Sequence, residues 1–453
     1  MKIYFYAGNM SLRRLLACLG FCIGAVILIV AALILIFGGA ILNGYGKGKV
    51  ERAFAEAHPG YTLRIGELGY AIGANRMDAR FVTLNTTNST LTVGRISLTG
   101  VRWVRFFCGK AALADFLAKA SLDATNLDMK FHRAQYGIRC ARLRASVPGS
   151  ELLAEKIDLS PLIGDEEIFT ASAFRTTLFR VSVPECRVLG LAYGELLAGK
   201  SYRARSVHFP GLSFDALVNR DKPVGPFVKS PLMVNEALGA IHKPLKIDSL
   251  SISNGYVKYC ERVAAGADPG VLTFAAVNIS VENIATRGKA PAAILLRAQG
   301  NLMNAGLLKV LMTIPVASPD FSLRYSGTLG AMDLTRLDAF LDIAEHLRIK
   351  SGSVQELTFE IDVSTGHARG RVRAVYKDFK VAVLDKQTGA EKGLDNRFAS
   401  FLMNVFKIRN SKTRNASGAM GEGKVNYTRK PDDGFMQFVW FALRSGVLDV
   451  INH

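Results

Sequence analysis

Apolar and polar residues alternate along most of this chain, which is the pattern of half-buried β-strands. The longest run alternates from Leu357 to Val363, turns at Ser364–His367 and returns through Gly370 to Ala374. Shorter runs of the same kind occur at Leu91–Leu98, Leu272–Val281, Leu308–Ile314 and Phe321–Tyr325. The pattern therefore predicts a mainly β fold with a few helices, in which antiparallel strands follow one another in a long meander.

Two positions interrupt this alternation in an informative way. Within Leu245–Tyr259, the pair Asn254-Gly255 is a strong signal for a tight type I′ turn. A hairpin at that point would pair Ile252 with Val257 on one apolar face. At Gly94 the alternation changes phase, which predicts a β-bulge.

Helical spacing of apolar residues is confined to a few segments. These segments are Lys49–His58, Ala111–Ala120, Leu334–Leu341, Phe398–Val405 and Phe435–Ile451. We expect the last of them to cap the sheet. Because no strong linker interrupts the chain, we expect residues 50–240 and 241–453 to be two parts of one elongated β-structure, with the halves meeting near Pro223–Pro231.

A segment near the N-terminus has the composition of a membrane-spanning helix. Residues 15–42 contain no charged side chain and would extend about 42 Å as a helix, against a hydrocarbon core of about 30 Å. A secretory signal has a shorter apolar core, so a retained signal-anchor is favoured over cleavage after Ala40. Basic residues flank both ends almost equally. We expect the short tail 1–14 to stay in the cytoplasm and the rest of the chain to lie on the far side.

The composition supports a folded domain with anionic partners. Hydrophobic residues make up 49% of the chain and charged residues 21%, which is enough apolar material for a large core. The net charge of +19 favours anionic partners. The positive charge is scattered, and no nucleic-acid-binding module is recognisable. With a membrane anchor present, anionic lipid or surface glycan is favoured over nucleic acid.

The cysteines allow two interpretations. Cys18 and Cys22 fall in the hydrophobic segment. The remaining cysteines are far apart in sequence and form no C-x-x-C motif; they are Cys108, Cys140, Cys186 and Cys260. In an oxidising compartment these four could form two disulfides, whereas in a large core they could equally be buried thiols.

Motifs that would indicate catalysis are weak. Gly418 to Lys424 matches G-x-x-x-x-G-K, but it lacks the following Ser or Thr and leads into the strand-like Val425–Tyr427 rather than a helix. No two of the seven histidines are close in sequence, and no H-E-x-x-H or G-x-S-x-G motif occurs. The sequence therefore predicts neither an enzyme nor a bound metal or other cofactor.

The apolar strand faces can be interpreted in two ways. They can pack in the core of a closed sandwich or beneath helices. Alternatively, a long curled sheet can leave its inner face open to lipid acyl chains. Alternation alone does not separate these possibilities, although the closed core is the commoner arrangement.

Several short motifs, in their order along the chain, resemble the AsmA-like proteins of Gram-negative envelopes. The motifs are Pro244–Leu250, Asn254–Tyr259, Asp268–Phe274, Phe321–Gly327, Met332–Leu334, Ser351–Gly352, Gly370, Gly423–Pro431, Phe435, Phe438, Trp440 and Ser445–Gly446. The signal-anchor followed by Thr62–Trp103 is similar to the layout of that family as well. The stretch Glu151–Ala240 matches least well.

The resemblance implies an inner-membrane anchor, a periplasmic groove of antiparallel strands and a relation to chorein-type bridge-like lipid-transfer proteins. The expected function is binding and transfer of phospholipid between inner and outer membrane, without covalent chemistry. The expected partners are acyl chains, the inner membrane and outer-membrane or envelope proteins. The alternative is a membrane-tethered scaffold or assembly factor for outer-membrane proteins, with a closed core and no lipid.

The groove lining that we predict consists of alternating apolar residues in the C-terminal part. These are Leu250, Ile252, Val257, Tyr259, Leu272, Phe274, Leu323, Tyr325, Phe359, Ile361, Val363 and Val372. Three basic residues, Lys246, Lys258 and Arg324, could attract anionic headgroups at the rim, although a solvated strand face is their commoner role.

Overall fold

The computed structural model describes most of the chain. The residues outside the description are 1–50, 53, 57–59, 72, 102–116, 226–232, 242, 287–292, 317–319, 386–410, 414–419, 432 and 453. The predicted anchor 15–42 and the predicted helix Phe398–Val405 lie outside it, as do parts of Lys49–His58 and Ala111–Ala120. Among the helices of the described residues, none is both long enough and apolar enough to span a membrane.

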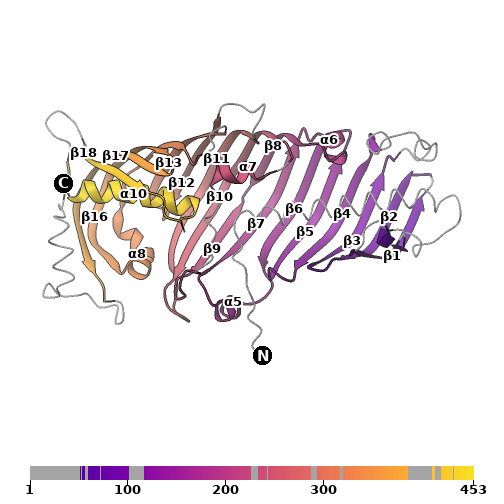
Figure 1. The fold of residues 1–453 in the computed structure, drawn as a ribbon, viewed down its shortest axis with the longest axis horizontal. Helices are drawn as coiled ribbons and strands as arrows, with labels where there is room; N and C mark the ends of the chain where they lie inside the picture. The colour runs from indigo at the N-terminus through magenta and orange to yellow at the C-terminus, as the bar shows by residue number, and fades with distance from the viewer. Residues whose placement is uncertain are drawn as a thin grey trace. The chain divides into compact units, whose positions relative to one another are not determined.

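The described residues are mainly β, as the alternation predicted, and they form two compact units (Figure 1). Among the described residues, the first unit comprises those up to Ser172 together with Leu178–Ser213, and the second comprises Ala173–Thr177 and those from Phe214 onward. The sequence placed the division between the two parts at residue 240.

Successive strands of the first unit pair antiparallel with one another. They are β1 (Thr62–Ala71), β2 (Arg76–Asn85), β3 (Ser89–Thr99), β4 (Ser121–Phe131), β5 (Tyr136–Ser146), β6 (Glu151–Pro161), β7 (Thr176–Leu189) and β8 (Tyr202–Pro210). Two short helices join them, α5 (Asp165–Ala171) and α6 (Tyr193–Leu197). Short connections between sequence neighbours produce the predicted meander.

The alternation does change phase at Gly94, because Val93 and Ile96 of β3 are both buried, but the predicted β-bulge is wrong. No register shift accompanies the phase change: β2 pairs Val82 with Val93 on one side of the kink and Arg80 with Arg95 on the other. The neighbouring strands kink at the same level, at Phe81 of β2 and Asn126 of β4, which have φ angles of 52° and 53°. The left-handed backbone conformation of Phe81 and Asn126 changes the phase of alternation in β2 and β4 at the same level as in β3. The apolar side chains of all three strands therefore stay on one face beyond the kink.

The second unit contains the strands predicted for the C-terminal half, and β9, β12 and β15 in addition. They are β9 (Ser213–Asn219), β10 (Leu245–Arg262), β11 (Gly270–Ala285), β12 (Ala293–Leu302), β13 (Gly306–Pro315), β14 (Leu323–Leu329), β15 (Met332–Asp333), β16 (Leu347–Ser364), β17 (His367–Val383) and β18 (Gly421–Thr428). The helices are α7 (Val234–Gly239), the 3-10 turn η1 (Leu334–Leu337), α8 (Asp338–Ala344) and α10 (Phe435–Asn452). The predicted turn at Ser364–His367 joins β16 to β17.

The predicted hairpin at Asn254-Gly255 is wrong, because β10 continues through this point. Asn254 does adopt a positive φ of 50°, as a type I′ turn would require. The same backbone conformation serves a bulge, and β11 is long enough to pair with β10 on both sides of it. Ile252 therefore lies opposite Ile279, and Val257 lies opposite Phe274.

Candidate functional site

Apolar side chains form continuous rows across the strands of the second unit. Residues directly opposite each other in adjacent strands lie on the same face of a sheet, so the pairing registers define these rows. One row contains Leu250, Val281, Leu296, Met312, Tyr325, Ile361, Gly370 and Val425. The next contains Ile252, Ile279, Ala298, Val310, Gly327, Phe359, Val372 and Gly423. We call this surface the apolar face.

The predicted lining residues fall on the apolar face. Besides those in the two rows, Tyr259 lies opposite Leu272 and Leu323 lies opposite Val363. Val257 and Phe274 stay on the same side as Ile252 because β10 and β11 both contain an irregularity between the two pairs.

Half of the predicted lining is buried beneath α10, which lies across the end of the sheet (Figure 1). The buried residues are Leu323, Tyr325, Phe359, Ile361, Val363 and Val372. They belong to one cluster with Phe438, Ala442 and Val450 of α10. The Tyr325 hydroxyl donates a hydrogen bond of 3.1 Å to the backbone carbonyl of Val439. At this end of the sheet the apolar face is thus a closed core.

The other half of the predicted lining is partly exposed. These residues, all on β10 and β11, are Leu250, Ile252, Val257, Tyr259, Leu272 and Phe274. The rows continue through half-buried Ile279, Val281, Leu296 and Val310. The sequence placed all but Leu296 in strands, without assigning them to the lining. Their alternation was visible, but only the registers show that they continue the rows. Tyr259 packs against Phe340 of α8, with ring centres 6.0 Å apart. Val281, Leu296 and Val310 pack against the same cluster as Val234 and Leu238 of α7, but part of their surface remains in contact with solvent.

The opposite face of the same strands is charged and internally paired. Arg324 and Asp362 form an ion pair of 2.5 Å with exposed side chains. Further pairs on this face are Arg297–Glu282, Arg371–Glu360 and Arg373–Glu422. Of the predicted rim cations, Lys246 pairs with Asp248 at 3.3 Å and Lys258 approaches Asp215 at 3.9 Å. Arg324 therefore belongs to a solvated strand face on the side away from the apolar rows.

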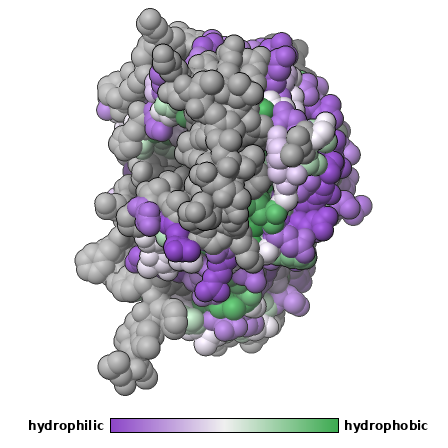
Figure 2. Space-filling model, turned by 90° about the vertical axis from the view of Figure 1, so that its right-hand side faces the viewer, coloured by the Kyte–Doolittle hydropathy of each residue, from purple (hydrophilic) through white to green (hydrophobic). Residues whose placement is uncertain are grey.

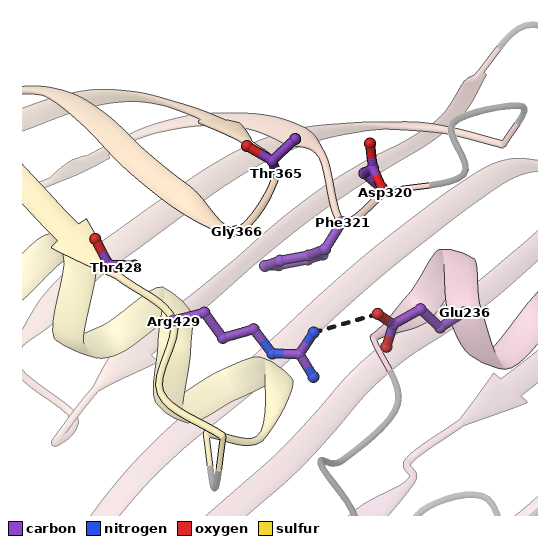
Figure 3. Close-up of a pocket in the computed structure, with 7 residues that line it drawn as sticks. All are labelled: Glu236, Asp320, Phe321, Thr365, Gly366, Thr428 and Arg429. Atoms are coloured by element: carbon purple, nitrogen blue, oxygen red, sulfur yellow. Dashed lines mark hydrogen bonds and ion pairs between the residues drawn. The ribbon is translucent and has the colours of Figure 1, made fainter.

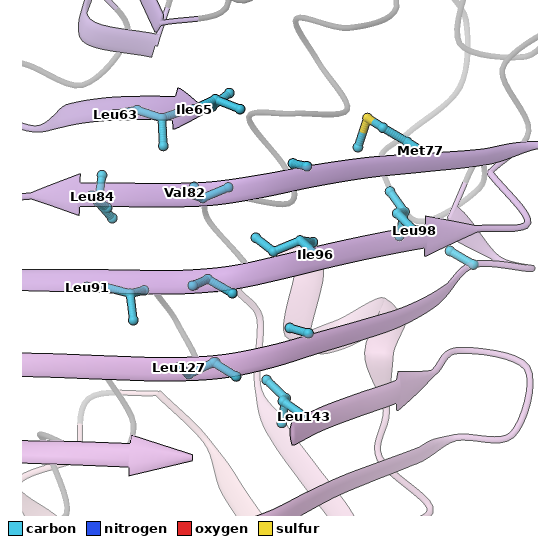
Figure 4. Packing of buried hydrophobic residues seen from close by; sticks show 14 of the residues in the cluster. Leu63, Ile65, Met77, Val82, Leu84, Leu91, Ile96, Leu98, Leu127 and Leu143 are labelled. Atoms are coloured by element: carbon cyan, nitrogen blue, oxygen red, sulfur yellow. The ribbon is translucent and has the colours of Figure 1, made fainter. Parts of the chain in front are cut away.

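The first unit has an equivalent apolar face. One row crosses seven strands through Leu63, Leu84, Leu91, Met129, Ile138, Leu159 and Val181. Figure 4 shows such side chains projecting from neighbouring strands toward the same side. Most of these residues are buried in a cluster that includes Phe54 and Val101. In the end view of Figure 2, the described outer surface is mostly hydrophilic, with small hydrophobic patches.

A small pocket in the second unit is polar. Its volume is about 310 Å³, and its lining comprises Glu236, Asp320, Phe321, Thr365, Gly366, Thr428 and Arg429 (Figure 3). The guanidinium group of Arg429 forms a 3.2 Å ion pair with Glu236 and lies 5.6 Å from the centre of the Phe321 ring. Because the protein's own carboxylate already neutralises this cation, the pocket is a structural contact rather than an anion site.

Two of the cysteines lie on the apolar face of the first unit. Cys140 is opposite Leu127 and Ile157, and Cys186 is opposite Ala154. Both are thiols, as is buried Cys260 of the second unit, while Cys108 lies outside the described residues. Burial raises the pKa of the Cys140 thiol and raises that of Cys186 to about 12, the latter helped by the charges of Cys140 and Glu185.

These pKa shifts predict slow thiol chemistry. At pH 8 an ordinary thiol is about one quarter thiolate, whereas a pKa of about 12 lowers the fraction roughly a thousandfold. We expect Cys186 to react with iodoacetamide about a thousand times more slowly in the native chain than in urea. Peptide mapping by mass spectrometry measures this at each site. Fast native labelling of Cys186 would contradict the raised pKa of its thiol.

The described residues contain no group of three or more His, Cys, Asp or Glu that could hold a metal ion. Comparison with known proteins adds no assignment, because neither a protein-family model nor a curated protein sequence matches this chain. The apolar face and the resemblance in the sequence are therefore the two features that bear on function.

Proposed function

We propose that this chain is a membrane-anchored lipid-binding protein that assists phospholipid transfer between the inner and outer membranes of a Gram-negative envelope. The observation that carries the proposal is the pair of apolar rows across β10–β18, which stay partly exposed on β10–β12 and at Val310 of β13. The resemblance to AsmA-like proteins supports the same assignment. The chain acts without covalent chemistry or a cofactor, through residues 15–42 in the inner membrane and the β-rich remainder in the periplasm.

The proposed mechanism is a lowering of the barrier to acyl-chain transfer. An acyl chain of about sixteen carbons in water costs about 0.8 kcal/mol for each exposed methylene, or roughly 13 kcal/mol in all. Contact with Leu250, Ile252 and Ile279 replaces water around the chain, while the headgroup stays in solvent. Because the rows run across the strands, an acyl chain that moves along a row loses contact with one apolar side chain as it gains contact with the next.

Site-specific photocrosslinking tests this function. A photoreactive benzoylphenylalanine placed at Ile279, on the apolar face, is expected to form phospholipid adducts in the full-length chain within its native membrane. The same residue at Ser280, on the opposite face of the same strand, is the matched control, and we expect at least about tenfold less adduct there. Equal labelling at both positions, or none at either, would argue against a lipid site.

The alternative function is a membrane-tethered scaffold for outer-membrane proteins. The observation that favours it is the burial of Phe359, Ile361 and Val372 beneath α10, where the face is a closed core. The same crosslinking experiment separates the two, because a scaffold would give protein adducts at Ile279 and no lipid.

A further inference from the structure

Helix α10 closes the open edge of the last strand as well as covering its face. Its buried stripe, which packs against the sheet, consists of Phe438, Ala442, Gly446 and Val450, spaced four residues apart. The next face of the helix carries Ser445 and Asp449, also four residues apart. This second face reaches the edge of β18.

Two side chains of α10 accept hydrogen bonds from backbone N–H groups of β18 that would otherwise be available to a neighbouring strand. The N–H group of Lys424 donates to Oδ2 of Asp449 at 2.7 Å, and the N–H group of Asn426 donates to Oγ of Ser445 at 3.2 Å. Residues two apart in a strand point their N–H groups to the same edge, so both bonds lie on the side of β18 away from β17. Covering an edge in this way prevents pairing with other strands.

Within the part of the chain that the structure describes, side chains of α10 close this edge. Two side-chain acceptors replace the regular backbone bonds that a neighbouring strand would supply, and the rest of the contact is apolar packing of the helix. Movement of α10 therefore exposes a strand edge of eight residues, Gly421–Thr428, ready for pairing.

We propose that β18 is a pairing surface for a second copy of this chain, and that α10 keeps it closed. In an antiparallel pair with Gly423 opposite Gly423, Glu422 of each copy lies opposite Lys424 of the other. Both positions belong to the outward edge of β18, so the two residues exchange backbone hydrogen bonds.

Charge favours this register over the next one. A shift of one residue in each copy places Lys424 opposite Lys424, and like charges directly opposite are destabilising. The chosen register instead places Glu422, which also pairs with Arg373 of its own chain, opposite Lys424 of the other copy, twice across an isologous interface. This proposal does not depend on lipid binding.

The test releases α10 in the full-length chain and measures its mass by size-exclusion chromatography with light scattering in detergent. The first variant combines S445A with D449A, and the second is V450D, which places a charge at a position 1% exposed in the wild type. Hydrogen exchange at α10 reports its release, and circular dichroism reports that the strands remain folded. We expect the released variants to run as dimers, against a monomeric wild type.

Two further changes test the edge and the register in a released variant. K424P removes the outward N–H group and is expected to restore the monomer. E422K places like charges opposite each other and should weaken the dimer about tenfold, whereas E422K with K424E should recover it. A released, folded chain that stays monomeric would overturn the proposal, as would a dimer that K424P leaves unchanged.

Discussion

Replacement of Gly423 by valine is expected to destabilise the second unit by about 3 kcal/mol, the upper range for overpacking a core. A Cβ atom at this position would lie 2.5 Å from the carbonyl oxygen of Gly446 and 2.7 Å from Cγ2 of Val450. The clash is with helix backbone, so no side-chain rotation relieves it. Helix α10 would have to move away from the sheet, exposing Val372 and Val425. Urea unfolding of the full-length chain, followed by circular dichroism, measures the loss.

The matched control is Gly69→Val on β1. Both positions are strand glycines, but no atom lies within 4 Å of the place where a Cβ would stand at Gly69. A β-branched residue suits an exposed strand position, so this change is expected to be neutral or slightly stabilising. If the two variants unfolded at the same urea concentration, the close approach of α10 to β18 would be excluded.

Loss of the Asp221 carboxylate is expected to cost about 3–5 kcal/mol, the range measured when one partner of a buried ion pair is removed. Asp221 lies 3.5 Å from Arg262, and the side chains are 12% and 4% exposed. In Asp221→Ala the guanidinium group keeps its charge in a site with little access to water. The double variant Asp221→Leu with Arg262→Met removes both charges and is expected to recover most of the lost stability.

The exposed pair Arg324–Asp362 provides the comparison. Its side chains are 69% and 57% exposed, so water solvates either charge when the other is removed. Asp362→Ala should therefore cost less than about 1 kcal/mol. Thermal unfolding of the variants side by side gives both numbers. Equal losses at the two sites would show that Asp221 and Arg262 are solvated in the native state.

The alternation of side chains determined which strands form and which residues share a face. In β16, Phe359, Ile361 and Val363 alternate with charged or polar neighbours, so one face had to be apolar whatever the strand paired with. The helix at Leu334–Leu341 and the capping segment at the C-terminus were likewise visible from spacing alone, because burial of one helical stripe imposes it.

Asn254-Gly255 shows where local sequence was insufficient. The positive φ angle that the pair favours occurs in a tight turn and also in a bulge. Whether Asn254-Gly255 forms a tight turn or a bulge depends on whether a partner strand extends past the site. That partner, β11, begins at Gly270 and was recognisable as a strand, but its register was not.

By itself the sequence determined that the chain is mainly β and that an apolar face exists, because side chains in a strand alternate whatever surrounds it. Irregularities in β10 and β11, which alternation does not show, keep Val257 and Phe274 on that face. The tertiary structure decided which part of the face meets solvent. Phe359 and Ile252 belong to the same row, yet α10 buries the first and leaves the second half-exposed. Burial depends on elements far away in sequence, so only their packing distinguishes a closed core from a surface that can bind a ligand.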